Sequence, residues 1–239
     1  MHYPKIYGFN KTSEAGVKVF APSIFLQGCN FKCPFCFNSS LAKSKMKDHH
    51  EIPLKIIDDF ILEHHPDMIM ISGGEAMVNN GLQNLMHHFR SMGLKIGLST
   101  NGVLWDRFIK IMHLVNYVAM DIKSADPETY EIFAPKGALN KVRITHGILR
   151  DNKRTKGESL FDYEVRTTLY PPYVNFNTIH QIGQMMEDNE RWVLQQYRPT
   201  VRLYDMEATK GIEPYDFETL QRMLTIARTY TKGAQLRYV

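Results

Sequence analysis

Cysteine is scarce in this sequence, and long apolar runs are missing from it. The chain has 239 residues but only three cysteines, an odd number that argues against a disulfide framework. A chain of this length also folds without such cross-links. No apolar run approaches the roughly 18 residues of a membrane span, and residues 1–5 lack the apolar core of a secretory signal. We therefore expect a protein of the reducing cytoplasm that does not bind membranes.

A strong excess of one charge is also lacking. The sequence has 29 Lys and Arg residues against 25 Asp and Glu residues, which gives a net charge of +4. So small an excess does not indicate nucleic-acid binding, and we expect no nucleic-acid partner. Internal repeats and low-complexity linkers are absent, and 44% hydrophobic with 23% charged residues is ordinary for a globular protein. We expect a single domain that spans residues 1–239.

The three cysteines lie together in one short segment. Cys29, Cys33 and Cys36 have the spacing C-x3-C-x2-C. Three thiolates are too few for a closed four-ligand site, but they can hold a [4Fe–4S] cluster and leave one iron with an open position, as catalytic metal sites do. Structural zinc is the alternative, and it would need a fourth ligand, for which His49 and His50 are the nearest downstream candidates.

Short apolar runs alternate with amphipathic segments along the chain, which is typical of β/α units with a parallel sheet. The expected strands are residues 17–25, 67–71, 94–98, 117–122, 162–169 and 192–197, and the pattern allows a short terminal strand at 235–239. The expected helices are residues 53–64, 81–92, 105–114, 127–133, 139–150, 178–187 and 215–230. Six such units predict an α/β fold built as an open, partial parallel β/α barrel.

Each of the six strands ends in polar residues. In parallel β/α folds the carboxyl ends of the strands meet at one face, and active sites lie there. In chain order the clusters are the three cysteines and residues 72–75, 99–101, 121–123, 166–168 and 195–197. Strand ends can be polar simply because they meet water, but this would explain one or two of the clusters better than all six. We expect a ring of polar groups around one mouth.

These motifs resemble those of the radical S-adenosylmethionine (SAM) enzymes. The cysteine motif follows the first expected strand, and Gly73-Gly74-Glu75 follows the second. Together with residues 25–29, 99–102 and 120–123, they resemble the glycyl-radical-enzyme activating enzymes, and residues 192–199 resemble the activating protein of anaerobic ribonucleotide reductase. The resemblance covers most of the chain.

The resemblance implies two cofactors, a [4Fe–4S] cluster and SAM. The reduced cluster would pass one electron to the sulfonium of SAM, giving methionine and a 5′-deoxyadenosyl radical that abstracts a hydrogen atom. The implied protein substrate is a glycyl radical enzyme such as anaerobic ribonucleotide reductase, and the implied electron donor is a flavodoxin or ferredoxin. Two alternatives stay open: a radical SAM enzyme acting on a nucleoside- or pterin-like small molecule, and a non-catalytic iron–sulfur or zinc binding module.

The resemblance also assigns a set of site residues. The cysteines would be the metal ligands and catalytic centre, and the residues expected to bind SAM are Phe35, Gly73, Gly74, Glu75, Ser99, Asn101, Asp121, Lys123, Arg166 and Gln196. Phe35 would face the adenine, and the glycines would let the backbone approach the methionine ammonium. Arg166 would bind the SAM carboxylate, although it can equally pair with Glu164. Gln195 and Gln196 point to opposite faces of their strand, so only one can face the barrel interior.

Three positions differ from the pattern usual in these activating enzymes. Phe37 stands where His is usual, Ala76 where Pro is usual, and Ser99 where Asp is usual. The change at Ser99 removes a carboxylate close to the methionine end of SAM. The sequence therefore does not predict a monovalent cation there.

Overall fold

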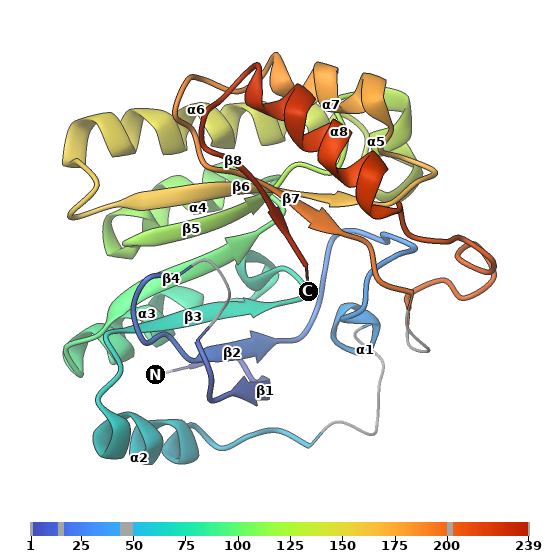
Figure 1. Ribbon diagram of the computed structural model, residues 1–239. Helices are drawn as coiled ribbons and strands as arrows, with labels where there is room; N and C mark the ends of the chain where they lie inside the picture. Colours follow the sequence, from blue (N-terminus) through green and yellow to red (C-terminus); the bar gives the residue numbers. More distant parts are fainter. Residues whose placement is uncertain (1, 14–16, 44–49, 200–202, 239) are drawn as a thin grey trace.

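A curved sheet of eight strands forms the centre of the molecule (Figure 1). The computed structural model describes residues 2–13, 17–43, 50–199 and 203–238. The strands are β1 (Ile6–Asn10), β2 (Ser23–Leu26), β3 (Met68–Gly73), β4 (Lys95–Thr100), β5 (Tyr117–Asp121), β6 (Asp162–Leu169), β7 (Trp192–Gln196) and β8 (Ala234–Arg237). Their order in the sheet is their order in the chain, and only β1 runs antiparallel to its neighbour.

Helices cover the outer face of the sheet (Figure 1). They are α1 (Ser39–Ala42), α2 (Leu54–His64), α3 (Leu82–Ser91), α4 (Trp105–Ile111), α5 (Pro127–Phe133), α6 (Ala138–Lys156), α7 (Phe176–Gly183) and α8 (Phe217–Arg228), with short 3₁₀ helices η1 (Ala76–Val78) and η2 (Met112–Leu114). Parallel neighbours need a long crossover connection, and at least one helix lies between each successive pair from β2 to β8. No helix in the described ranges combines the length and apolar character that crossing a membrane requires.

Apolar side chains pack on both faces of the sheet. Along β3, Ile69 and Ile71 belong to the large core between the strands and the helices. Met68 and Met70 point the other way, where they form a smaller cluster with Tyr117. The inside of the barrel is therefore filled at the amino-terminal end of these strands, so a ligand site can open only toward their carboxyl ends.

The predicted open parallel β/α barrel is confirmed, because the sheet runs from β1 to β8 without closing on itself. The first predicted strand is shorter than expected, since Pro22 lacks the N–H group that a regular ladder needs. Strand β1 was not predicted, and Gly8 interrupts its short apolar run. The allowed terminal strand is present as β8. His49, one of the two candidate zinc ligands, lies outside the described residues.

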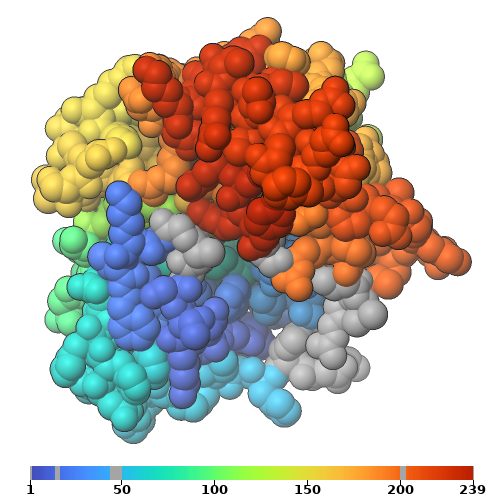
Figure 2. All heavy atoms as spheres, in the orientation of Figure 1, coloured from blue at the N-terminus to red at the C-terminus, as the bar shows by residue number. Residues whose placement is uncertain are grey.

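The two ends of the described chain share one face of the molecule. Figure 2 shows the N-terminal residues in blue below and the C-terminal residues in red above on that face. The arrowheads of β2 to β7 point toward the side where the loop after β2 lies (Figure 1). This loop carries the three cysteines.

Candidate active site

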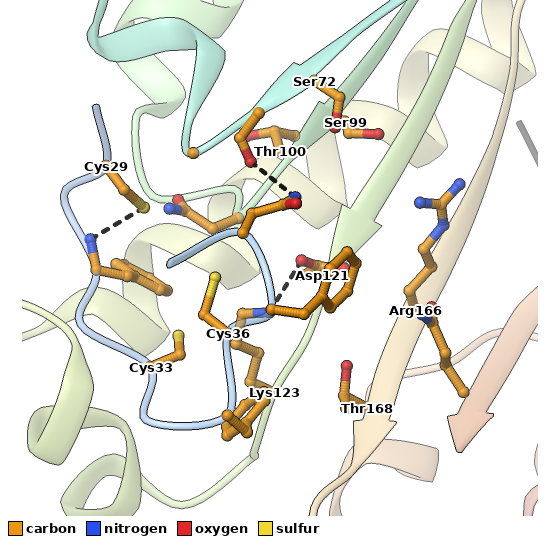
Figure 3. Close-up of a pocket in the computed structure, with 18 of the residues that line it drawn as sticks. Cys29, Cys33, Cys36, Ser72, Ser99, Thr100, Asp121, Lys123, Arg166 and Thr168 are labelled. Carbon is orange, nitrogen blue, oxygen red and sulfur yellow. Dashed lines mark hydrogen bonds and ion pairs between the residues drawn. The ribbon is translucent and has the colours of Figure 1, made fainter. Parts of the chain in front are cut away.

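A cavity of about 390 Å³ opens at the carboxyl ends of the strands, between the cysteine loop and β3 to β7. Figure 3 shows it with the three sulfur atoms on one side and Arg166 on the other. The residues selected from the sequence that line it are Cys29, Cys33, Phe35, Cys36, Gly73, Gly74, Ser99, Asn101, Asp121, Lys123, Arg166 and Gln196. Only Glu75 of the selected set does not line it. The fold thus gathers these side chains around one space, while their roles toward a ligand stay predictions.

The cysteine loop is fastened at three points by backbone hydrogen bonds. The Gly28 N–H donates to the Leu41 carbonyl at 2.8 Å, just inside α1. The Lys32 N–H donates to the carbonyl of Phe133, the last residue of α5, at 2.7 Å. The carbonyl of Pro34 accepts from the Asp205 N–H at 3.1 Å. Elements that lie far apart in the chain therefore hold the thiols in place.

Two glycines at the end of β3 bring that strand directly against the cysteine loop. Gly73 has a φ of +123°, which side chains rarely permit, and a Cβ there would collide with the backbone of Leu26. A Cβ on Gly74 would collide with the carbonyl oxygen of Gly28. The Gly74 N–H donates to the Leu26 carbonyl at 3.1 Å. The absence of side chains thus sets the spacing between the two motifs.

Glu75 lies behind the cavity wall and has no exposed surface. Its carboxylate accepts hydrogen bonds from the Asn101 N–H at 2.7 Å and from Thr100 Oγ1 at 3.0 Å. Asn101 in turn donates from Nδ2 to Asn30 Oδ1 at 2.8 Å. Burial raises the pKa of Glu75 to about 7, although these hydrogen bonds favour the charged form. Glu75 therefore joins the ends of β3 and β4 and positions Asn101.

Asp121 and Lys123 form an ion pair at 2.9 Å on the cavity wall. Only 12% of the Lys123 side chain is exposed, so the pair is not an ordinary surface pair. Burial by itself lowers the pKa of Lys123, but the charge of Asp121 and its hydrogen bond to the amine act in the other direction, and the pKa is raised, so the amine stays charged. A fixed cation and anion side by side are suited to a zwitterionic ligand.

Aromatic rings support the cysteine loop from behind. Phe35 is 6% exposed and stacks on Tyr170 with 4.8 Å between ring centroids. Tyr170 contacts Tyr197, which also lines the cavity, at 5.0 Å. Phe35 therefore presents only part of its surface to a ligand, and this apolar wall excludes water from one side.

Arg166 both lines the cavity and pairs with Glu164, at 2.5 Å from Nε to Oε1. On β7, Gln195 lies opposite the inward-facing Thr168, whereas Gln196 donates from Nε2 to the Tyr215 carbonyl at 3.1 Å. Both glutamines reach the cavity lining, and the register favours Gln195 for the interior.

The sequence analysis placed Thr100, Thr168 and Gln195 in the polar ring at the strand ends but did not include them among the residues expected to bind SAM, and all three line the cavity. Thr168 follows Arg166 by two residues and so shares its face of β6. That alternation is the signal that could have identified it. The polar cluster at residues 99–101 indicated that Thr100 lies near the mouth, but its hydrogen bond to Glu75 could not be anticipated from the sequence.

A model of the radical SAM superfamily matches residues 23–182 of the chain, from β2 through α7. This match includes all three cysteines and covers most of the chain. The chain belongs to the radical SAM superfamily.

Two related proteins of Methanocaldococcus jannaschii carry a provisional assignment as glycyl-radical enzyme activating enzymes. One is 29% identical over 220 residues, covering 90% of this chain and 88% of its own. The other is 30% identical over 168 residues, covering 70% of this chain and 62% of its own. Among solved structures, Streptococcus suis SuiB bound to S-adenosylmethionine has a TM-score of 0.62 at 15% identity, over 89% of this chain and 48% of SuiB. At that identity the likeness to SuiB supports the fold alone.

The superfamily implies a [4Fe–4S] cluster and SAM, and the thiols of this radical SAM protein fit such a cluster. The described residues include no group of three or more His, Cys, Asp or Glu side chains placed to hold a single metal ion. The three thiols lie together on one side of the cavity, as the ligands of one cluster would (Figure 3). Thiolates are the usual protein ligands of such clusters.

The protonation of the thiols argues against a nucleophilic role for them. Burial raises the pKa of Cys29 and of Cys33 to about 12, and it raises the pKa of Cys36 as well. Without metal these groups are protonated at neutral pH and are weak nucleophiles. Metal binding removes the proton from such a thiol. The buried thiols are therefore poorly suited to nucleophilic catalysis by cysteine.

Proposed function

We propose that this radical SAM enzyme generates a glycyl radical on a partner protein, such as anaerobic ribonucleotide reductase. One electron from a flavodoxin or ferredoxin, delivered through the cluster, would cleave SAM to methionine and a 5′-deoxyadenosyl radical. That radical would take a hydrogen atom from a glycine Cα, leaving 5′-deoxyadenosine and the glycyl radical. The M. jannaschii relatives support the activating role, because the alignment with one of them covers 88% of its length.

The size and position of the cavity carry this proposal. Its volume of about 390 Å³ is near the lower end of the range for pockets that hold one small ligand. A cluster and SAM would leave little of it for a second small molecule. A glycine on a polypeptide loop can instead enter from the mouth, where Arg198 and the 62%-exposed Phe37 lie.

The residues around the cavity have distinct tasks in this proposal. Cys29, Cys33 and Cys36 hold the cluster, and the backbone at Gly73 and Gly74 approaches the methionine end of SAM. The ion pair of Asp121 and Lys123 faces the charged amino and carboxylate groups. Phe35 and Tyr170 exclude water, which protects a reactive carbon radical from side reactions. Asn101 binds the ribose or the methionine end and is held in place by Glu75.

The test is an anaerobic reaction of the reconstituted protein with SAM, a reductant and purified anaerobic ribonucleotide reductase. We expect a glycyl-radical doublet in the electron paramagnetic resonance spectrum, together with 5′-deoxyadenosine and methionine. Cys33→Ala should abolish all three signals, because the cluster loses a ligand. Cleavage of SAM by this variant would refute the ligand assignment.

Two other results would favour one of the alternative functions over this proposal. Formation of 5′-deoxyadenosine over many turnovers with a nucleoside- or pterin-like compound, and no radical on any protein, would indicate the small-molecule alternative. No 5′-deoxyadenosine from reduced protein and SAM would indicate a non-catalytic binding module. We further propose that the protein is a single domain that works in an oxygen-poor cytoplasm, because an open cluster requires low oxygen.

A further inference from the structure

A buried ion-pair cluster lies on the inner face of the sheet, next to the cavity. The carboxylate of Glu164 in β6 has no exposed surface. It accepts one hydrogen bond from Arg166 Nε at 2.5 Å and two from Arg237, at 2.8 Å from Nη1 and 2.9 Å from Nη2. Arg166 lines the cavity, whereas Glu164 and Arg237 do not. One carboxylate therefore connects the cavity wall to β8.

The strand register explains how these residues meet. Alternation along β6 places Glu164, Arg166 and Thr168 on the same face. Thr168 lies opposite Gln195 of β7, which lies opposite Arg237 of β8. The Arg237 side chain therefore reaches across β7 to Glu164, two strands away, and only 12% of it is exposed.

An ion-pair cluster is not the most stabilising way to fill this buried space. Taking charges out of water is costly, and buried ion pairs are often no more stabilising than apolar packing. Deeper on the same inner face the fold uses apolar side chains, including Met68 and Met70. Burial would raise the pKa of Glu164, but hydrogen bonds from Arg237 and the charge of Arg166 hold it at about 2, so the carboxylate stays ionised. What the ion-pair cluster provides beyond apolar packing is a fixed orientation of the Arg166 guanidinium.

We propose that Arg237 is a positioning residue. It fixes the carboxylate of Glu164, which in turn holds the Nε edge of Arg166. The guanidinium of Arg166 is thereby directed at a carboxylate of the bound ligand. A guanidinium is planar, so fixing Nε also fixes the plane of its terminal N–H groups. Two such groups bind a carboxylate in a fork geometry. This inference rests on the proposed function, because it takes SAM or its polypeptide target as the ligand of the cavity.

The carboxylate could come from the methionine end of SAM or from the target polypeptide. The test measures binding at equilibrium, without turnover, on anaerobically reconstituted protein. The ligands are SAM, decarboxylated SAM and a peptide that spans the target glycine. Arg237→Gln removes the bidentate partner of Glu164. Arg150→Gln is the matched control, because Arg150 pairs with the carboxylate of Glu187 at 3.0 Å and does not line the cavity.

We expect Arg237→Gln to weaken binding of the carboxylate-bearing ligand by about tenfold, the lower end of what losing an orienting partner costs in metal sites. If SAM is the source, decarboxylated SAM binds the variant as it binds the wild type. If the peptide is the source, SAM binding is unchanged and only peptide binding weakens. Arg150→Gln should change none of these affinities, and Arg237→Lys should restore part of the loss.

A variant combining Arg166→Gln with Arg237→Gln separates positioning from a general structural effect. If Arg237 acts through Arg166, the double variant binds no more weakly than Arg166→Gln alone. Additive losses, an equal loss for SAM and decarboxylated SAM, no loss for any ligand, or the same loss in Arg150→Gln would each overturn the proposal. If the wild-type protein binds no SAM, the proposed function is overturned as well. If the wild type binds its ligands and Arg237→Gln binds them equally well, this inference alone is overturned.

Discussion

Glu75 carries a buried carboxyl group whose protonation is linked to folding. Its pKa of about 7 lies above the ordinary value of 4.5, because burial outweighs its hydrogen bonds and the nearby charge of Asp121 adds to the shift. The folded protein therefore holds this proton more tightly than the unfolded chain does. The stability from this linkage is fully present below the ordinary pKa, and it is lost as the pH rises through 7.

Replacing Glu75 with Gln should remove this dependence on pH. One such group changes the free energy of unfolding by at most about 1.4 kcal/mol per pH unit. We expect the Glu75→Gln variant to lose less stability than the wild type between pH 5 and pH 8. Urea unfolding of reconstituted protein at several pH values measures this, and parallel curves for the two proteins would contradict the assigned shift.

Single residues also mark the limit of what the sequence can predict. The cysteines stand in a compact motif and the two glycines follow a predicted strand, so the position of both at the site could be anticipated from the sequence and its family resemblance. The burial of Glu75 could not, because it depends on the approach of Asn101 from the next strand. Arg237 gave no signal either, since its partner Glu164 lies two strands away and 73 residues earlier in the chain.

At the scale of elements, β3 and the cysteine loop are in contact through glycine backbone. A Cβ at Gly74 would have to displace the Gly28 carbonyl, which begins the loop. We expect Gly74→Ala to lower stability by about 1–3 kcal/mol, as forced overpacking does, and to reduce the iron bound per chain. Thermal unfolding and iron analysis after reconstitution measure both effects.

Gly147 offers the control for this substitution. It lies within α6, and a Cβ added there would meet nothing within 4 Å. Gly147→Ala should therefore leave iron binding unchanged and stabilise the protein by about 0.5–1 kcal/mol. Normal iron content in Gly74→Ala would show that the loop tolerates the displacement.

The elements themselves were largely predictable from sequence. Apolar runs that end in polar clusters indicated β3 to β7, because buried parallel strands lead directly into a polar mouth. The four-residue α1 was too short to show a helical period, and α6 continues to Lys156, past the expected end at residue 150. The choice between Gln195 and Gln196 depended on strand register, which the sequence of one strand does not contain.

At the scale of the whole molecule, the cysteine loop packs at the edge of the main core. Phe31, Cys33 and Phe35 of the loop belong to that core, but most of it lies between the sheet and the helices. Metal that binds only the folded state stabilises it by mass action. We expect removal of the cluster with a chelator to lower the thermal midpoint of unfolding while the far-ultraviolet circular dichroism at 25 °C is retained. Equal midpoints with and without the cluster would mean that it does not bind preferentially to the folded chain.

The fastening of the cysteine loop has a consequence for biosynthesis. The thiols leave the ribosome early, but the backbone groups at Phe133 and Asp205 that hold their loop are translated much later. A nascent chain would therefore present loose thiols to oxidants and to stray metal ions. We therefore expect the iron–sulfur assembly machinery to insert the cluster after translation, when the backbone groups at Phe133 and Asp205 are both in place.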